Sequence, residues 1–236
     1  MPPLTAAFSR VAVYGALLLA APSAAVPQIY SSDHWSYVTK LTQDTLDLEI
    51  AGHIFRGKTI FVRFIPSPGC GCCRKQAPAW DSITRAAAEE QDVVFGDFDM
   101  AANQDFSDTD IGVGGWPMVR YYNARTGAKG RPYVQKTDRS MCDELAEESY
   151  MKAYVEEAAD ILLCDVVTGQ KCSAKETAYI EKMGGKSPEE LGSQLARLVG
   201  MEGSSMTPEL KSWLVSRQKI LKNLSAALSA KLNDEL

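Results

Sequence analysis

Three cysteines stand within four residues, as Cys70-Gly71-Cys72-Cys73, directly behind an apolar run that is predicted to be a buried strand. Cysteine thiolates are strong nucleophiles, and two cysteines separated by two residues suit reversible disulfide formation. The following residues favour a helix, so the motif lies at a helix start, where unpaired amides and the helix dipole stabilise a thiolate. Arg74 and Lys75 add positive charge. The pattern indicates redox chemistry with Cys70 and Cys73 as the reactive pair.

Cys72 lies inside this pair, and the sequence leaves three interpretations of it open. It is an inert small side chain, a competing partner that forms a Cys70-Cys72 bridge, or a third thiol that releases trapped substrates. A bridge between the neighbours Cys72 and Cys73 would be strained. Zinc needs a fourth ligand, and neither His34 nor His53 belongs to such a cluster. We therefore expect no metal.

The elements that must position the cysteines follow from the apolar patterns. Strands are predicted at 38–42, 59–65, 93–99, 117–122 and near 133–134, and helices at 42–52, from the cysteine motif to about 90, at 101–110 and at 142–160. Strands that alternate with helices predict a mixed central sheet covered by helices on both faces. The fold class is therefore α/β.

The last quarter of the chain has only helical patterns. Ser187-Pro188-Glu189-Glu190 is a capping box with proline at the first helical position. A third helix follows Thr207-Pro208, with apolar residues at steps of three and four. We expect an all-helical domain over 174–232, joined to the first domain by a linker over 161–173. Cys164 and Cys172 flank a short loop in that linker and are expected to form a structural disulfide.

The two ends of the chain carry targeting signals. An apolar run over residues 11–21, followed by small residues, is typical of a secretory signal peptide over 1–25. The final residues Asn233-Asp234-Glu235-Leu236 resemble the address that returns proteins to the endoplasmic reticulum. The formal net charge of -5 argues against nucleic-acid binding. We expect a protein of the endoplasmic reticulum lumen without a membrane span, in which the six cysteines form disulfides.

Two separated motifs resemble the thioredoxin domains of protein disulfide isomerases. The first runs from Pro68 through the cysteines to Trp80, and the second is Gly115-Trp116-Pro117. The resemblance covers about residues 38–160 and implies a thioredoxin fold over 26–160. The helical patterns after residue 174 are similar to the small all-helical domain of some isomerases and of their redox-inactive relatives.

The resemblance also implies roles for single residues. Cys70 would attack substrate disulfides and Cys73 would resolve the mixed disulfide. Gly71, Trp116 and a cis-Pro117 would shape the substrate groove. The helix that begins near Cys142 starts on the active-site side of a thioredoxin fold, so Cys142 is a candidate auxiliary thiol, with a regulatory or shuttle role.

The motif departs from the family at three positions. Gly69 replaces a tryptophan, Cys72 replaces a histidine, and Arg63 or Phe64 stands where a buried glutamate would fall. These changes remove groups that stabilise the thiolate and accept a proton. We therefore expect slower turnover than in an ordinary isomerase domain.

The sequence thus predicts an enzyme, a thiol-disulfide oxidoreductase or isomerase that acts on folding proteins. The alternative is a redox-weak chaperone or escort protein. No cofactor is expected beyond the Cys70-Cys73 disulfide, with glutathione as its redox partner. Expected partners are unfolded or disulfide-containing clients, the retrieval receptor and a second subunit. Asn223 lies in a glycosylation sequon within a predicted helix.

Overall fold

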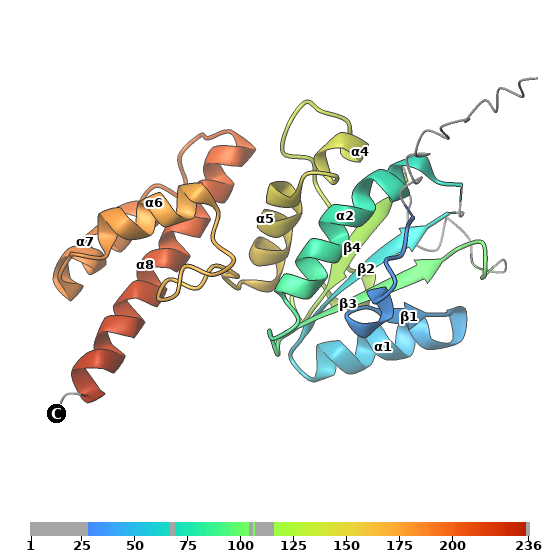
Figure 1. Ribbon diagram of the computed structural model, residues 1–236, viewed down its shortest axis with the longest axis horizontal. Coiled ribbons are helices and arrows are strands. Elements are labelled where there is room, and N and C mark those ends of the chain that lie inside the picture. Colours follow the sequence, from blue (N-terminus) through green and yellow to red (C-terminus); the bar gives the residue numbers. More distant parts are fainter. Residues whose placement is uncertain (1–27, 67–68, 104–105, 107–115, 235–236) are drawn as a thin grey trace, which may run out of the picture.

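The computed structural model describes residues 28–66, 69–103, 106 and 116–234. A sheet with helices on both sides forms one part, and three helices form the other (Figure 1). The predicted signal peptide lies outside the described residues, as do Glu235 and Leu236. No helix in the described ranges is long and apolar enough to cross a membrane.

The sheet has five strands in the order β1-β3-β2-β4-β5. Its members are β1 (Thr39–Leu41), β2 (Thr59–Ile65), β3 (Val93–Asp99), β4 (Met118–Tyr122) and β5 (Arg131–Pro132). The first three are parallel, whereas β4 runs antiparallel to β2 and β5 antiparallel to β4. This mixed sheet, with helices on both faces, confirms the predicted α/β thioredoxin fold.

Successive residues of the central strand β2 face two different cores, as the period of a strand requires. Ile60, Val62 and Phe64 pack on the side of α1 (Gln43–Phe55). Phe61 packs on the opposite side, against α2 (Gly71–Ala86) and α5 (Glu148–Ala159). Every residue of β2 is buried. The strand was predictable because burial on both faces requires a continuous apolar run.

Two predicted boundaries differ from the structure. The first helix does not stop at Gly52 but continues to Phe55 and ends before Gly57, whose φ is 74°. The last strand is Arg131–Pro132 rather than 133–134, although the Tyr133 amide still donates to the Val119 carbonyl over 2.8 Å. Most of the expected helix over 101–110 lies outside the described residues.

The predicted single helix over 142–160 is wrong, because the chain forms two helices there. These are α4 (Met141–Glu144) and α5, and the segment between them contains the buried Leu145. The Glu144 carboxylate is buried and accepts hydrogen bonds from the amides of Lys136 and Thr137 over 2.7 and 2.9 Å. These contacts from outside the helix tie α4 to the preceding loop.

Three helices follow the linker: α6 (Ala174–Met183), α7 (Pro188–Val199) and α8 (Pro208–Asp234). Capping boxes start α6 at Ser173 and α7 at Ser187, as the sequence predicted for the latter. Their shared core consists of Met183, Leu191, Leu198, Leu214, Ile220, Leu221 and Leu224. Helix α8 continues to Asp234, so Asn233 and Asp234 of the expected retrieval signal belong to its last turn.

Candidate active site

The cysteine motif lies between the end of β2 and the first turn of α2. Cys70 is the N-cap residue of α2, and the Cys73 amide points to the Cys70 sulfur at 3.1 Å. The two cysteines form a disulfide with a Cα–Cα distance of 5.2 Å. Cys73 is fully buried, whereas Cys70 is partly exposed. Of the two sulfurs, the Cys70 sulfur is therefore the one that a substrate can reach.

The residues expected to shape a groove lie at the same edge of the sheet. Met118 pairs with Phe64 near the end of β2, so the preceding Trp116 and Pro117 lie beside the strand end that leads into the cysteine motif. The peptide bond between Trp116 and Pro117 is cis. Gly71 is exposed in the first turn of α2. The structure therefore brings these three residues and the reactive pair to one end of the sheet.

Cys72 is joined to Cys142, with a Cα–Cα distance of 5.2 Å. This pairing differs from all three interpretations of Cys72 left open by the sequence, and neither residue is a free auxiliary thiol here. The expected position of Cys142 near the motif agrees with the bridge. Because α4 is separate from α5, its first turn can lie against α2 (Figure 1).

An ion pair supports the same contact between α2 and α4. Lys75 donates to Asp143, the neighbour of Cys142, and both side chains are partly exposed. Ser140 caps α4 by accepting from the Asp143 amide over 3.1 Å. The charge of Lys75 and the Ser140 hydroxyl hold the pKa of Asp143 below its usual value. Helix α4 thus has anchors besides the disulfide.

A buried charged cluster that sequence reasoning missed lies across the centre of the sheet. Arg63 on β2 faces Asp97 on β3, and its Nε donates to Asp97 Oδ1 over 3.0 Å. His34 lies between two carboxylates, with Nε2 2.9 Å from Asp97 and Nδ1 2.8 Å from Asp81. Arg63, Asp97 and His34 are almost completely buried. A buried arginine of this kind requires a charged partner.

Electrostatics fix the charge of Asp97. Burial alone would raise its pKa, but the Arg63 guanidinium and the hydrogen bond from His34 outweigh burial and hold the pKa below its usual value. The Arg63 guanidinium also stacks over the Trp80 ring at 5.1 Å. The cluster is therefore an ionised carboxylate held between two basic side chains.

The cluster is connected to the cysteine pair through the segment before β1. Ile29 and Tyr30 pack with Ile65 and Cys73 in one apolar group. The Tyr30 ring lies 5.0 Å from the His34 ring. Burial, with the charges of Asp97 and Asp99, raises the pKa of Tyr30, so its hydroxyl stays protonated. One side of the reactive pair is thus apolar and close to the charged cluster.

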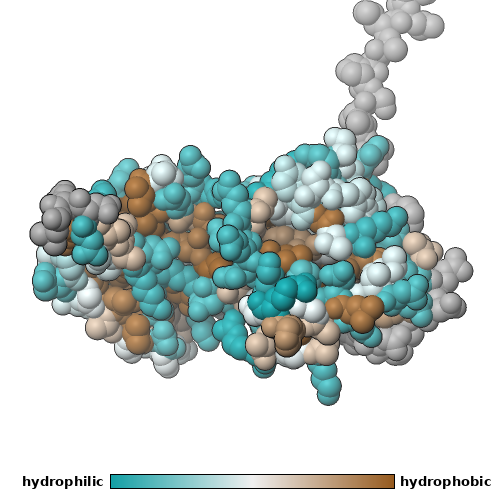
Figure 2. Space-filling view, turned by 90° about the horizontal axis from the view of Figure 1, so that it is seen from below, coloured by the Kyte–Doolittle hydropathy of each residue, from teal (hydrophilic) through white to brown (hydrophobic). Residues whose placement is uncertain are grey.

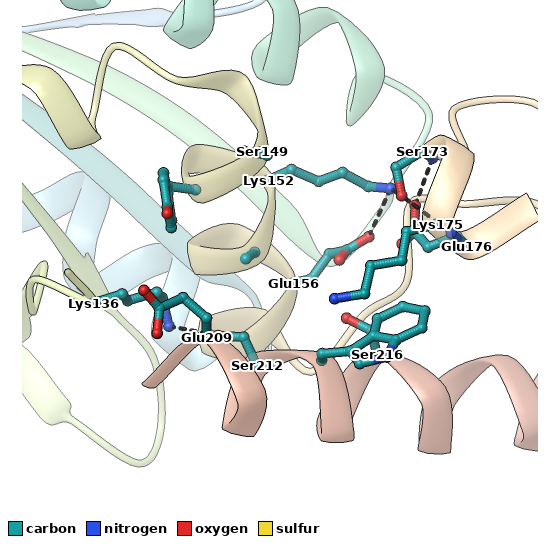
Figure 3. A pocket seen from close by; sticks show the side chains of 13 residues that line it. Lys136, Ser149, Lys152, Glu156, Ser173, Lys175, Glu176, Glu209, Ser212 and Ser216 are labelled. Atoms are coloured by element: carbon teal, nitrogen blue, oxygen red, sulfur yellow. Dashed lines mark hydrogen bonds and ion pairs between the residues drawn. The ribbon is translucent and has the colours of Figure 1, made fainter. Parts of the chain in front are cut away.

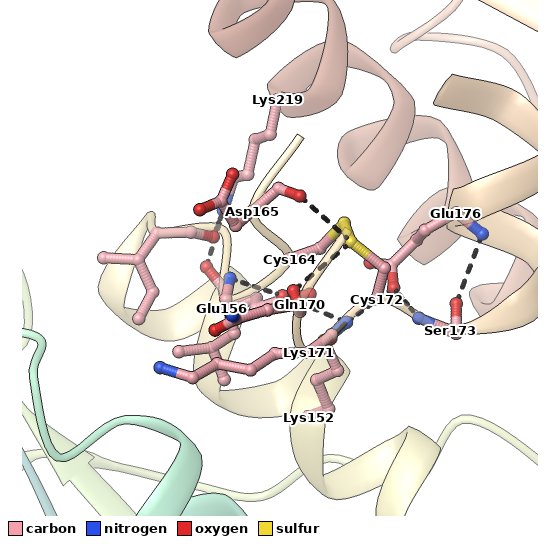
Figure 4. A network of polar contacts seen from close by, with 12 residues as sticks. Lys152, Glu156, Cys164, Asp165, Gln170, Lys171, Cys172, Ser173, Glu176 and Lys219 are labelled. Carbon is pink, nitrogen blue, oxygen red and sulfur yellow. Dashed lines mark hydrogen bonds and ion pairs between the residues drawn. A yellow bond between two sulfur atoms is a disulfide. The ribbon is translucent and has the colours of Figure 1, made fainter. Parts of the chain in front are cut away.

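The linker contains the third disulfide, between Cys164 and Cys172 (Figure 4). These residues are 8 positions apart and enclose a turn organised by Asp165, whose carboxylate accepts from the amides of Val167 and Thr168 over 2.7 and 3.0 Å. Lys219 of α8 donates to the carbonyl oxygens of Glu156 and Ile161 over 2.6 and 2.9 Å. The linker region therefore fastens α8 to the end of α5.

A separate cavity of about 250 Å³ lies between α5, the start of α6 and α8 (Figure 3). Lys152 lies between Glu156 and Glu176 on its wall, at 3.7 and 2.5 Å. The Lys175 ammonium lies over the Trp213 ring at 4.5 Å. No cysteine lines this cavity. It is distinct from the cysteine site.

Comparisons with known proteins support the motif-based resemblance over part of the chain. No family model matches. The chain is 31% identical over 81 residues to protein disulfide-isomerase A2 of Pongo abelii, which is 34% of this chain and 15% of that protein. It is 30% identical over 84 residues to the protein disulfide-isomerase-like protein EhSep2 of Emiliania huxleyi, or 36% of each chain. The chain therefore spans well under half the length of these relatives.

Solved structures give weaker matches. A fragment of ERdj5 containing J and Trx1 aligns with 54% of this chain and 55% of its own, at a TM-score of 0.39 and 20% identity. A thioredoxin f2 complex aligns with 52% of this chain and 94% of its own, at a TM-score of 0.39 and 17% identity. The resemblance to protein disulfide isomerases is confirmed by the sequence relatives, over about a third of the chain.

Proposed function

We propose that this chain, whose thioredoxin fold carries a segment related to protein disulfide isomerases, is a thiol-disulfide oxidoreductase that acts on disulfides of folding proteins. One observation carries the proposal: a Cys-x-x-Cys disulfide at the start of α2 with one accessible and one buried sulfur. That asymmetry assigns the two cysteines different roles.

The reaction follows from the positions of the sulfurs. In the reduced protein, the Cys70 thiolate attacks one sulfur of a client disulfide, and the other client sulfur leaves as a thiolate. Cys73, which loses its proton, then attacks Cys70 and releases the second client sulfur. The client gains two electrons and the pair becomes a disulfide. The helix N-terminus stabilises the Cys70 thiolate in each cycle.

The departures from the family pattern are expected to slow the resolving step, in which Cys73 must lose its proton. Arg63 stands in the region of β2 where the resemblance implies a buried glutamate, and the carboxylate in the structure is Asp97 on the neighbouring strand. Asp97 is bound by Arg63 and His34, so it is a weaker proton acceptor than a lone buried carboxylate. We therefore expect slow deprotonation of Cys73.

The cellular setting is part of the proposal. The signal peptide pattern over 1–25 and the terminal sequence Asn233-Asp234-Glu235-Leu236 support residence in the endoplasmic reticulum lumen with return by the retrieval receptor. Glutathione is the proposed redox partner, and unfolded or disulfide-containing proteins are the proposed clients. The helical domain would bind clients or a second subunit.

A chaperone or escort that lost its redox chemistry is the second candidate. The altered positions 63, 69 and 72 favour it. On the face seen in Figure 2, hydrophobic residues form separate patches over both parts of the molecule. The Cys70–Cys73 pair is nevertheless intact, and this makes the enzyme our conclusion.

Turnover of a disulfide-bonded peptide tests the enzyme proposal. We expect the wild-type protein to reduce the peptide in glutathione buffer, Cys70→Ser to be inactive, and Cys73→Ser to accumulate a covalent adduct between Cys70 and the peptide. A Cys164→Ser/Cys172→Ser variant, altered only in the linker bridge, is the matched control and should stay active. Equal activity in wild type and Cys70→Ser would refute the enzyme proposal.

A further inference from the structure

We propose that the Cys72–Cys142 disulfide is a second redox-active bridge that exchanges with the Cys70–Cys73 pair, so that one molecule stores two disulfides for its client. This inference rests on the proposed oxidoreductase function. It gives chemical roles to Cys72 and Cys142, which otherwise only join α2 to α4.

The two bridges are close enough to exchange. Cys72 lies two residues after Cys70 and next to Cys73. Gly71, the residue between Cys70 and Cys72, is the first residue of α2, and in helical geometry Cα atoms two residues apart are about 5.4 Å apart. Disulfides span Cα–Cα distances of about 4.4 to 6.8 Å. A Cys70–Cys72 bridge is therefore within reach.

The backbone at Cys70 also permits this bridge. Residues two positions apart within a helix do not face each other. Cys70 is not inside α2, because it is the N-cap residue with φ -59° and ψ 104°. Its side chain is consequently free of the helical orientation that directs Cys72 and Cys73 to different sides. Rotation at Cys70 can bring its sulfur to either neighbour.

The exposure of the four sulfurs fits an exchange chain. Cys70, Cys72 and Cys142 are each partly exposed, whereas Cys73 is buried. The three residues that take part in the first exchange step, Cys70, Cys72 and Cys142, can therefore be approached by a thiolate. Cys72 also lies in the first turn of α2, where a departing thiolate is stabilised by the free amides.

Helix α4 should stay in place when its disulfide opens. The Lys75–Asp143 ion pair connects α4 to α2 independently of the sulfurs. The buried Glu144 carboxylate ties α4 to the 136–137 loop through two backbone amides and the Thr137 hydroxyl. These contacts hold the Cys142 thiol near Cys72, so the bridge can form again.

The bonds and electrons of the exchange balance among the four cysteines, without another reactant. After the Cys70–Cys73 disulfide has oxidised a client dithiol, the Cys70 thiolate attacks the Cys72 sulfur. The Cys70–Cys72 bond forms, the Cys72–Cys142 bond breaks, and Cys142 leaves as a thiolate. Cys73, after losing its proton, then attacks Cys70, and Cys72 leaves as a thiolate that takes up a proton. The pair is oxidised again, and Cys72 and Cys142 have gained its two electrons.

The test counts disulfides delivered by the fully oxidised full-length protein to excess reduced dithiol peptide, without oxygen or another oxidant. We expect two peptide disulfides per wild-type molecule and one per Cys72→Ser/Cys142→Ser molecule. A Cys70→Ser/Cys73→Ser variant should deliver none, and peptide mapping should show Cys164–Cys172 still bridged.

Any other number of peptide disulfides delivered per protein molecule would contradict the exchange. One disulfide from both wild type and Cys72→Ser/Cys142→Ser would mean that the second bridge is only structural. One disulfide from Cys70→Ser/Cys73→Ser would mean that clients reduce Cys72–Cys142 directly. No disulfide from any form would refute the proposed function as well, which separates the two failures.

A trapping experiment gives a second readout that does not depend on removing the second bridge. In oxidised Cys73→Ser the exchange stops at the first step, so mapping should find Cys70–Cys72 bridged in part of the molecules, with Cys142 open to alkylation. In Cys70→Ser/Cys73→Ser, Cys142 should stay protected. Complete protection of Cys142 in Cys73→Ser would overturn the proposal.

Discussion

Arg63 and Asp97 show how one buried charge determines its surroundings. An arginine in the middle of a fully buried strand is costly unless a carboxylate meets it. The parallel register between β2 and β3 places Asp97 directly beside Arg63. His34 then bonds to the same carboxylate and to Asp81. The resemblance to disulfide isomerases implied a buried glutamate at or next to position 63 on β2. In the structure the buried carboxylate belongs to Asp97 on the neighbouring strand β3.

Replacing Asp97 with asparagine should destabilise the fold strongly, because it leaves the Arg63 charge buried without a counter-ion. Breaking one partner of such a pair costs about 3 to 5 kcal/mol. Urea unfolding at pH 7 measures this loss. Asp92→Asn, at an exposed site next to the same strand, is the control and should change little. A loss below about 1 kcal/mol in Asp97→Asn would contradict the account of the cluster.

The lowered pKa of Asp97 predicts that the stability of the fold decreases at acidic pH. Its pKa is lower in the folded state than the usual value near 4. Its ionised form therefore stabilises the protein above about pH 4, and this contribution is lost as pH falls through the folded pKa. Stability measured from pH 6 down to pH 3 should fall more steeply in wild type than in Asp97→Asn. Parallel curves would show that Asp97 is not the group that titrates.

Part of the buried cluster of Arg63, Asp97 and His34 could have been predicted from the sequence. An aspartate within the apolar run 93–99 and an arginine within the run 59–65 both require partners, and neighbouring strands could have paired them. His34 gave no such signal. It lies in a 3-10 turn before β1, and only the folded arrangement brings it between Asp81 and Asp97.

The contact between α2 and α4 depends on α4, a helix of four residues that sequence patterns describe poorly. The central strands were predicted correctly because burial on both faces imposes long apolar runs. The division of 142–160 into two helices was missed because its cause is not local. Glu144 accepts hydrogen bonds from the 136–137 loop and from the Tyr133 hydroxyl, and no helical periodicity encodes such contacts.

The Cys72–Cys142 bridge should contribute more to stability than the linker bridge. It closes 70 positions of sequence, whereas Cys164–Cys172 closes 8. The chain-entropy treatment gives about 4 kcal/mol for the first and about 2.5 kcal/mol for the second. Urea unfolding of the two paired cysteine-to-serine variants measures both losses. An equal or larger loss in Cys164→Ser/Cys172→Ser would contradict this ranking.

The two parts of the molecule are joined where α5, the linker and α8 meet (Figure 4). Glu156 is at the centre of this joint, and its carboxylate accepts from the Leu163 amide over 2.8 Å. Burial raises its pKa to about 7, although the charge of Lys152 and that hydrogen bond oppose the shift. The folded state therefore holds a proton on Glu156 that the unfolded chain releases above about pH 4.5.

The raised pKa of Glu156 predicts that stability falls with rising pH. The contribution of the protonated carboxyl is complete below about pH 4.5 and is lost as pH rises through about 7. A shift of this size corresponds to a loss of about 3 kcal/mol between these values. Unfolding by urea at pH 5 and pH 8 should show this loss in wild type and little of it in Glu156→Gln. Glu148→Gln, exposed on the same helix, is the control and should behave like wild type. An equal decline in Glu156→Gln would contradict the assignment.

A glutathione redox titration of the protein, with mass-spectrometric mapping of the peptide that holds Cys70, Cys72 and Cys73, tests the central claim most directly. We expect a reversible two-electron transition of the Cys70–Cys73 pair near the poise of the endoplasmic reticulum lumen, about -180 to -210 mV. A pair that stays locked in one oxidation state across that range would contradict the oxidoreductase account and favour the chaperone alternative.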